Sequence, residues 1–455
     1  MTHSDDHSDD HSDGSSGLRR LLDRQAIDTR PLRVAPYRRL LVGQGTSFIG
    51  SMLTQVAVPV QVYDLTRSSL DVGYVGLAGL LPIVGFGLWG GAIADVVDRR
   101  VLYLWSSLLG WAVTLAFLAQ TLLDVRSVPL ILGLVVMQAG AFAVASSARG
   151  AIIPRIVPTE LVPAANTLNF TVGNVGQVVG PLLAGVLVVL PHGFVYAYGA
   201  DGLLFTSALW SAFRLPSVPP LAGAARPGAG AGAVLEGLRF IAVRPVLLMS
   251  FAVDITAMVL AMPRSLFPEV AAMRYGGNVG PLYAAIAIGA VVAGVSSGWI
   301  GRVRRQGVAL VVAIAGWGGA IALAGLAHQL WLAVVLLALA GAFDLVSAVY
   351  RQTILQTYAP DEMRGRMQGV FIAVVAGGPR LGDVRAGATA AFSSATVSWV
   401  GGGLVCLVVV VIAGVLVRPF WHYDARADLR PEAPVVAREG GPAGAGAPKP
   451  QSPVG

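Results

Sequence analysis

The chain has 455 residues, of which 55% are hydrophobic and only 13% are charged, and its mean hydropathy is +0.69. This balance excludes an ordinary soluble globular protein, in which about a quarter of the residues are charged. The single cysteine excludes a disulfide within the chain. The net charge of +7 comes from arginines spread over many short segments, which argues against a nucleic-acid-binding domain.

Long apolar stretches recur along most of the chain. A bilayer core about 30 Å thick needs roughly 20 apolar residues per helix, so we predict an all-α integral membrane protein with twelve transmembrane helices. The predicted spans are residues 39–63, 70–94, 101–123, 128–149, 166–190, 195–213, 245–264, 279–300, 307–327, 330–350, 368–393 and 397–417.

The distribution of Lys and Arg predicts the orientation. With the N-terminus inside, the outer loops contain only Arg67, Arg126, Arg264 and Arg274 of the 32 basic residues, and Arg380 and Arg385 remain within a span. Basic residues concentrate on the cytoplasmic side of membrane proteins. We therefore expect both termini in the cytoplasm and the protein in the cell membrane.

The two tails are too polar or too rich in Pro, Ala and Gly to form a packed core. Residues 1–36 show no signal-peptide pattern, and we expect both this segment and residues 419–455 to be disordered cytoplasmic tails. The run HSDDHSDDHSDG near the start could bind a divalent metal weakly, but a solvating role is favoured, and no metal site is predicted.

The two halves of the membrane region resemble each other. ARGAIIPRIVPTEL follows the fourth span and YRQTILQTYAPDEM follows the tenth, so that an Arg precedes a Pro by the same spacing in both (Arg149 to Pro158, Arg351 to Pro360). A Pro/Gly/Ala-rich segment lies between the halves and ends in an amphipathic stretch, VLEGLRFIAV. We expect two pseudo-symmetric six-helix bundles, residues 37–213 and 245–418, joined by a cytoplasmic linker of residues 214–244.

The loop after the second span, GAIADVVDRR, resembles the signature loop of the major facilitator superfamily. Gly91 allows close helix approach, Asp95 can face the N-terminus of a neighbouring helix, and Arg99 and Arg100 can pair with acidic groups across the two halves. Together they would form a conformational latch. Asp98 stands where this signature commonly has Gly, so the local turn can differ. Alternatively, the two arginines only fix the topology.

Span five contains GNVGQVVGPLLAG and resembles the helix motif of exporters in the same superfamily. Gly176 and Gly180 form a small-residue face, Pro181 bends the helix, and Gly185 follows, with Ala184 in place of a further glycine. The resemblance implies export. A packing role without directional meaning is the alternative.

Further segments narrow the resemblance to one branch. VPVQVYDLTRSSLDVG, PLYAAIAIG and TILQTYAPDEMRGRMQGV are similar to segments of the enterobactin exporters and other transmembrane secretion effectors. This resemblance implies the major facilitator fold and the movement of a siderophore or drug across the membrane, without naming the substrate.

Charged residues within the spans are the candidates for transport chemistry, because a charge at bilayer depth is costly unless it faces a polar path or a partner. We predict Asp254, Asp344 and Asp383 as proton-coupling residues. The predicted substrate or counter-ion residues are Arg380, Arg385, Gln55 and Asn174. Each of these could instead serve only to hold helices together.

Span eleven contains GGPRLGDVRAG, with three charges near its middle. Arg380 and Asp383 are three residues apart and share a helix face, whereas Arg385 points elsewhere. An Arg380–Asp383 pair is therefore expected. Whether Asp383 carries a proton or only holds Arg380 in place is left open by the sequence.

The sequence predicts a secondary transporter that works by alternating access. No P-loop and no arrangement of catalytic residues occurs, so we expect no enzymatic activity and no cofactor. The favoured activity is proton-coupled export of a hydrophobic or amphipathic small molecule by a monomer. Import or facilitated uptake of a nutrient is the main alternative, and a sensor or scaffold is a third.

Overall fold

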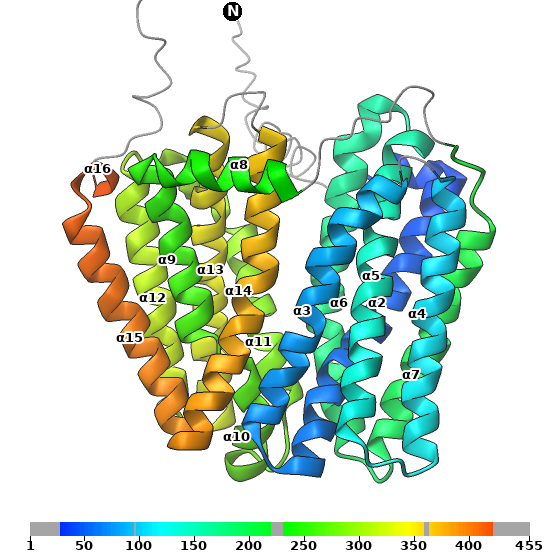
Figure 1. Ribbon diagram of the computed structural model, residues 1–455, viewed down its shortest axis with the longest axis horizontal. Coiled ribbons are helices and arrows are strands. Elements are labelled where there is room, and N and C mark those ends of the chain that lie inside the picture. The colour runs from blue at the N-terminus through cyan, green and yellow to red at the C-terminus, as the bar shows by residue number, and fades with distance from the viewer. Residues whose placement is uncertain (1–27, 95–96, 220–230, 359–363, 422–455) are drawn as a thin grey trace, which may run out of the picture.

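The computed structural model describes residues 28–94, 97–219, 231–358 and 364–421. The expected disordered tails, Asp95 of the loop after span two and much of the interbundle linker lie outside the described residues. Within the described ranges, helices dominate and form two groups that stand side by side (Figure 1).

Each group contains six long helices. The N-terminal bundle consists of α2 (Ala35–Thr66), α3 (Ser69–Ala94), α4 (Arg99–Leu122), α5 (Val128–Ile156), α6 (Val162–Val188) and α7 (Gly193–Phe213). The C-terminal bundle consists of α9 (Pro245–Ala261), α11 (Gly280–Val295), α12 (Gln306–Leu326), α13 (Leu330–Tyr358), α14 (Arg364–Phe392) and α15 (Ala395–Leu416). The shorter helices are η1 (Arg30–Arg33), η2 (Thr159–Leu161), α8 (Ala231–Ala242), η3 (Arg264–Leu266), α10 (Phe267–Arg274), η4 (Ser297–Arg302) and α16 (Arg418–Trp421).

The chain is built to cross a membrane. Seven of the described stretches are long and apolar enough to do so by length and composition, and α11 and the first part of α3 are shorter apolar helices. Large apolar side chains also face outward from the bundles, for example Phe170 and Leu203, which are 68% and 71% exposed. Such exposure is expected where lipid, rather than water, covers the surface. The six long helices of each bundle correspond in order to the predicted spans.

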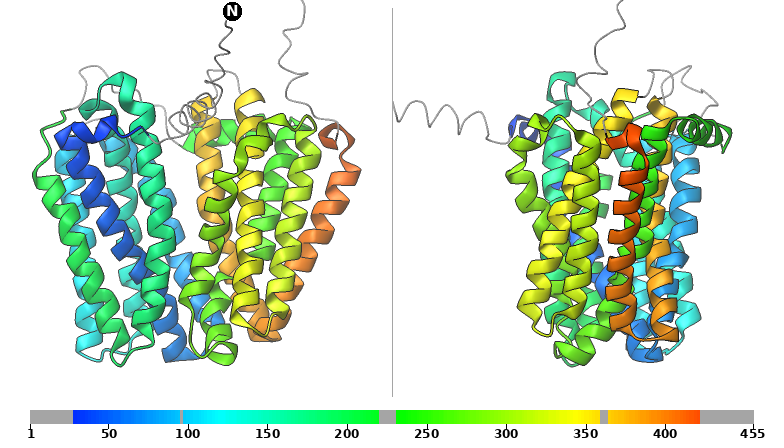
Figure 2. Two further views of the ribbon diagram at one scale, coloured as in Figure 1. Left: turned by 180° about the vertical axis from the view of Figure 1, so that it is seen from behind. Right: turned by 90° about the vertical axis from the view of Figure 1, so that its left-hand side faces the viewer.

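One end of the molecule carries the helix that precedes the second bundle, and we call it the linker face. The amphipathic segment forms α8, which runs crosswise at this end of the C-terminal bundle (Figure 1) and projects to one side of it (Figure 2, right). The opposite end, where α2 leads into α3, is called the far face. By the positive-inside rule, the linker face is the expected cytoplasmic side.

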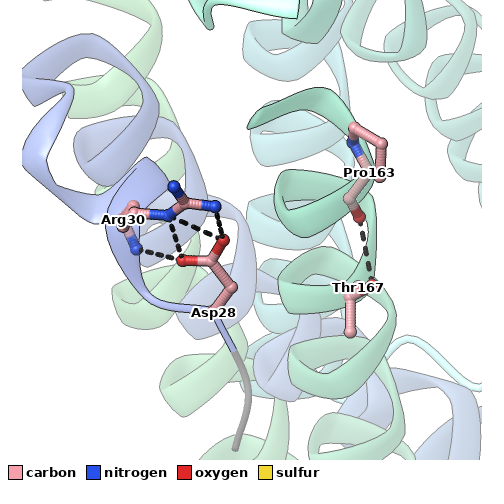
Figure 3. A network of polar contacts seen from close by, with 4 residues as sticks. All are labelled: Asp28, Arg30, Pro163 and Thr167. Carbon is pink, nitrogen blue, oxygen red and sulfur yellow. Dashed lines mark hydrogen bonds and ion pairs between the residues drawn. The ribbon is translucent and has the colours of Figure 1, made fainter. Parts of the chain in front are cut away.

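The described chain enters the N-terminal bundle beside α6. The carboxylate of Asp28 accepts hydrogen bonds from the Arg30 guanidinium at 2.6 to 3.0 Å, and these side-chain bonds lower the pKa of Asp28 (Figure 3). Nearby, the Thr167 hydroxyl donates to the carbonyl of Pro163 within the first turns of α6. The Asp28–Arg30 pair is solvent-exposed, so it contributes little stability.

A buried carboxylate holds the interior of the N-terminal bundle. Asp201 of α7 is 0% exposed and accepts a hydrogen bond from Thr54 of α2 at 2.5 Å and from Thr114 of α4 at 3.4 Å. α7 thus packs this carboxylate between α2 and α4. The bonds to two hydroxyls offset part of the cost of burial.

The two bundles meet near the far face. α3 packs against α14, and α6 packs against α11. Small residues allow the close approach, because a Cβ added at Gly185 of α6 would lie 2.6 Å from Cα of Gly280 in α11. Ser69 of α3 donates a short hydrogen bond to Glu269 of α10, so the contact also has a polar component across the bundles.

Candidate functional site

A central cavity of about 650 Å³ lies between the bundles. Residues from α2 to α7 line one side of it, and residues from η3, α11, α13 and α14 line the other. The lining runs from Val72 and Arg264 near the far face to Tyr103 and Arg149 near the linker face. The cavity therefore follows the direction of the helices for much of their length.

The walls combine apolar surface with neutral polar groups. Aromatic side chains such as Phe48 and Phe205 alternate with polar ones, and both Gln55 of α2 and Asn174 of α6 belong to the lining. A lining of this kind suits an amphipathic small molecule, because apolar contacts supply most of the affinity and a few polar groups fix the orientation.

Five charged residues line the cavity, and positive charges outnumber negative ones. The arginines are Arg149, Arg264 and Arg380, and the carboxylates are Asp344 and Asp383. In the described part of the chain, no carboxylate forms an ion pair with any of these three arginines. Nε of Arg264 is buried without a hydrogen-bond partner there. The cavity thus offers guanidinium groups to an incoming anion.

The glycine face of α3 positions the charged segment of α14. A Cβ added at Gly76 would lie 3.2 Å from Oδ2 of Asp383, and one added at Gly79 would lie 3.6 Å from Nε of Arg380. Larger side chains at these α3 positions would fill the space that the two charged side chains occupy. The charged turn of α14 is therefore held against the opposite bundle.

The expected pairing of Arg380 with Asp383 does not form. Nη1 of Arg380 donates instead to the carbonyl of Ala376 at 2.5 Å, one turn earlier in α14. The Asp383 carboxylate accepts a hydrogen bond from the backbone N–H of Ser265 at 3.1 Å. Each side chain has a backbone partner instead, so Asp383 does not hold Arg380 in place through an ion pair.

Arg385 turns away from the cavity, as its rotation around the helix suggested. Its Nε donates to the carbonyl of Val259 at 3.1 Å and its Nη1 to that of Ser398 at 3.3 Å. The carbonyls in the last turn of a helix lack intrahelical partners, and Val259 lies in the last turn of α9. The contacts of Arg385 thus tie α9, α14 and α15 together.

Asp254 also lies outside the cavity lining, in a buried ion pair inside the C-terminal bundle. Arg351 of α13 forms a short ion pair with Asp254 of α9, and its Nη2 lies 3.7 Å from Oδ1 of Asp344. The predicted span ends at residue 350 and so places Arg351 in a cytoplasmic loop. The structure corrects this, since α13 continues to Tyr358 and buries the guanidinium.

Asp98, in the loop after α3, forms hydrogen bonds within the N-terminal bundle. The Asp98 side chain caps α4 by accepting from the N–H of Arg100 at 2.8 Å, and it also accepts from Ser217. Burial alone would raise the pKa of Asp98, but these hydrogen bonds and one from the N–H of Val218 outweigh it and lower the pKa. The departure from Gly thus has a structural use as a helix cap.

The proposed latch arginines contact carbonyls of the N-terminal bundle. Arg99 donates to Ala151 of α5 at 3.3 Å, and Arg100 donates to Phe213 of α7 at 2.8 Å. These contacts join α4 to its own neighbours α5 and α7. Gly91 lies within α3, and its role in a latch stays a prediction.

The exporter motif divides its contacts between two partners. Gly176 and Gly180 face Phe48 and Met52 of α2 within the N-terminal bundle, whereas Gly185 faces α11 of the other bundle. Pro181 is buried inside α6, and its carbonyl faces Gly280. The motif therefore joins the packing of one bundle to the contact between bundles.

Two six-helix bundles around a central, charge-containing cavity define a secondary transporter of the major facilitator superfamily. Solved transporters share this fold. The nucleoside transporter NupG has a TM-score of 0.65 at 12% identity, covering 86% of this chain and 100% of its own. A bacterial homologue of the human lysosomal transporter Spinster has a TM-score of 0.62 at 17% identity, covering 88% and 98%.

The family follows from the sequence comparisons. Residues 27–442 match the transmembrane secretion effector family, and the chain belongs to it. The enterobactin exporter EntS of Citrobacter koseri is 29% identical over 410 residues, or 88% of this chain and 95% of that protein. The enterobactin exporter of Escherichia coli K12 is 28% identical over 411 residues, or 89% and 96%. The resemblance noted in the sequence is confirmed, and members of this superfamily are transporters, not enzymes.

Proposed function

We propose that this transporter exports an amphipathic small molecule, such as a siderophore or drug, in exchange for protons. The observation that carries the proposal is the cavity between the bundles, whose lining combines aromatic, neutral polar and charged side chains. The similarity to enterobactin exporters favours a siderophore, and enterobactin is the first substrate to test.

The closed far face supports uptake of substrate from the cytoplasm. The bundles contact each other through α3 with α14 and through α6 with α11, near the far face. If the linker face is cytoplasmic, as the basic residues predict, this conformation seals the outer side. Rocking of the two bundles, residues 37–213 and 245–418, about the cavity would then open the far face.

Asp344 and Asp383 are the proposed proton carriers. Both carboxylates line the cavity, so substrate and proton can compete for the same polar region. Asp344 lies at the edge of the Arg351 pair, 3.7 Å from Nη2, and Asp383 accepts from a backbone N–H. Asp254 is the weaker candidate, because its short ion pair with Arg351 favours a permanently charged state.

Inverted membrane vesicles with an acidic interior test direction and coupling together. We expect enterobactin to accumulate inside vesicles that contain the protein, and the combined variant Asp344→Asn with Asp383→Asn to lose gradient-driven accumulation. Asp64→Asn is the matched control, because Asp64 is an exposed carboxylate of α2 that pairs with Arg67 outside the cavity.

Two results would overturn the proposal. Accumulation that is independent of the pH gradient and unchanged in the double variant would exclude proton coupling through these carboxylates. Net inward accumulation of the same compound by whole cells would instead establish the importer alternative.

A further inference from the structure

Arg149 is a cavity-lining charge that neither the exporter motif nor the proton-coupling proposal uses. It lies on α5 toward the linker face, beside Tyr103. Within the described residues, its side-chain partners are that tyrosine and the hydroxyl of Ser146 at 3.4 Å, one turn earlier in the helix. A guanidinium has five N–H groups, so most of its hydrogen-bonding capacity is available to a ligand.

Comparison with Arg351 shows how unusual this position is. The two arginines lie at the same distance from the start of equivalent helices, α5 and α13. Arg351 is neutralised by Asp254 of α9. The helix equivalent to α9 in the N-terminal bundle is α2, whose sole carboxylate, Asp64, lies at the far-face end and pairs with Arg67 at 3.2 Å. Of the two equivalent arginines, Arg351 has an ion-pair partner and Arg149 faces the cavity.

The remaining cavity arginines lie farther from the linker face than Arg149. Arg264 belongs to η3 at the far face, and Arg380 lies on the part of α14 that contacts α3. Arg149 is seven residues from the linker-face end of α5, and Arg380 is sixteen residues from that end of α14. At a rise of 1.5 Å per residue, Arg149 therefore lies roughly 13 Å closer to the linker face along its helix. The same cavity is also lined by apolar and aromatic side chains.

We propose that the cavity binds an elongated organic dianion. Arg264 and Arg380 hold one anionic group farther from the linker face, and Arg149 holds the other near the linker face, while the aromatic lining contacts the body of the molecule. This inference rests on the proposed function only for the claim that the cavity is the substrate site, and it adds the charge and shape of the substrate. Guanidinium groups suit carboxylate, phenolate or phosphate groups, because they form charge-assisted and often bidentate hydrogen bonds.

Three biphenyl probes separate charge from shape. The para,para′-dicarboxylate of biphenyl supplies two anionic ends, the monocarboxylate supplies one, and the monocarboxamide supplies none. Calorimetry on the purified full-length protein in detergent gives the Kd of each probe. The Kd of the dicarboxylate should be lower than that of the monocarboxylate by on the order of tenfold, because a second charge-assisted contact forms. The carboxamide should bind more weakly than either.

Variants then locate the second contact. Arg149→Gln should remove the preference for the dicarboxylate, whereas Arg149→Lys should keep most of it. Arg155→Gln is the matched control, since Arg155 is an exposed arginine of the same helix outside the cavity lining. Arg380→Gln should weaken both anions. Raising the salt concentration should shrink the preference in the unaltered protein, which tests the charge without any substitution.

The inference is overturned if Arg149→Gln retains the full preference, if Arg155→Gln loses it equally, or if the carboxamide binds as tightly as the anions. These binding measurements need no pH gradient and do not report the direction of transport. A protein that shows the dianion preference but fails to export would contradict the proposed function alone, and one that exports without the preference would contradict this inference alone.

Discussion

The buried pair between Arg351 and Asp254 gives the sharpest test of the packing. Replacing Arg351 with Gln should strongly destabilise the protein, because it leaves the carboxylate of Asp254 without its partner where the two side chains are only 6% and 3% exposed. Breaking a buried ion pair from one side typically costs about 3–5 kcal/mol. Replacing both residues, Asp254→Asn with Arg351→Gln, should recover most of that loss, since no unpaired charge remains.

The assay is the melting temperature of the purified protein in detergent, followed by tryptophan fluorescence. The four proteins of the cycle are the unaltered chain, the two single variants and the double variant, and Arg155→Gln reports the effect of losing an exposed arginine. Asp344→Asn should cost less than Asp254→Asn, because the Asp344 contact is 3.7 Å long. If the effects of the two single substitutions simply add in the double variant, the two side chains are not coupled and the reasoning is refuted.

Three further predictions concern the ends of the bundles. Gly280→Leu should abolish transport without loss of expression, because the new side chain meets the α6 backbone at Gly185. The accessibility of a cysteine placed in the cavity should change as well. Unchanged transport would contradict the close packing of α6 against α11. Asp98→Ala should lower stability by about 1 kcal/mol through loss of the α4 cap. The pKa of Asp98 is lowered in the folded protein. The stability difference between the unaltered chain and Asp98→Asn should therefore stay constant from about pH 8 to about pH 5 and shrink only below the ordinary pKa of 3.8. A change in this difference near neutral pH would contradict the assignment. Glu269→Gln should weaken the Ser69 contact and shift the population toward far-face opening, measured by spin-label distances across α3 and α10, whereas an unchanged distance distribution would argue against a latch.

The sequence predicted the arrangement of helices better than the contacts of their side chains. Runs of apolar residues located the spans, and the small-residue spacing of span five predicted a packing face, whose partners α2 and α11 only the structure shows. The rotation of Arg385 away from Arg380 followed correctly from helix geometry, and the structure adds the carbonyls that Arg385 contacts. Such features depend on local periodicity, which a single sequence contains.

Contacts between distant segments could not be read in this way. Arg351 was assigned to a loop because hydropathy marks where apolar residues end, whereas the helix itself continues. The repeat of Arg149 and Arg351 was visible in the sequence, but only the structure shows that Asp254 neutralises one of them. The Ser69–Glu269 bond across the bundles joins residues 200 positions apart and had no sequence signal.

Proton exchange through the cavity is the central claim, and it can be measured directly. Inverted vesicles with an acidic interior and a pH-sensitive dye report the gradient as substrate is added. We predict that enterobactin partly dissipates the gradient in vesicles with the unaltered protein and that the response is lost in the variant carrying Asp344→Asn and Asp383→Asn. An equal response in that variant, or transport of the substrate with no change in the gradient, would contradict the account.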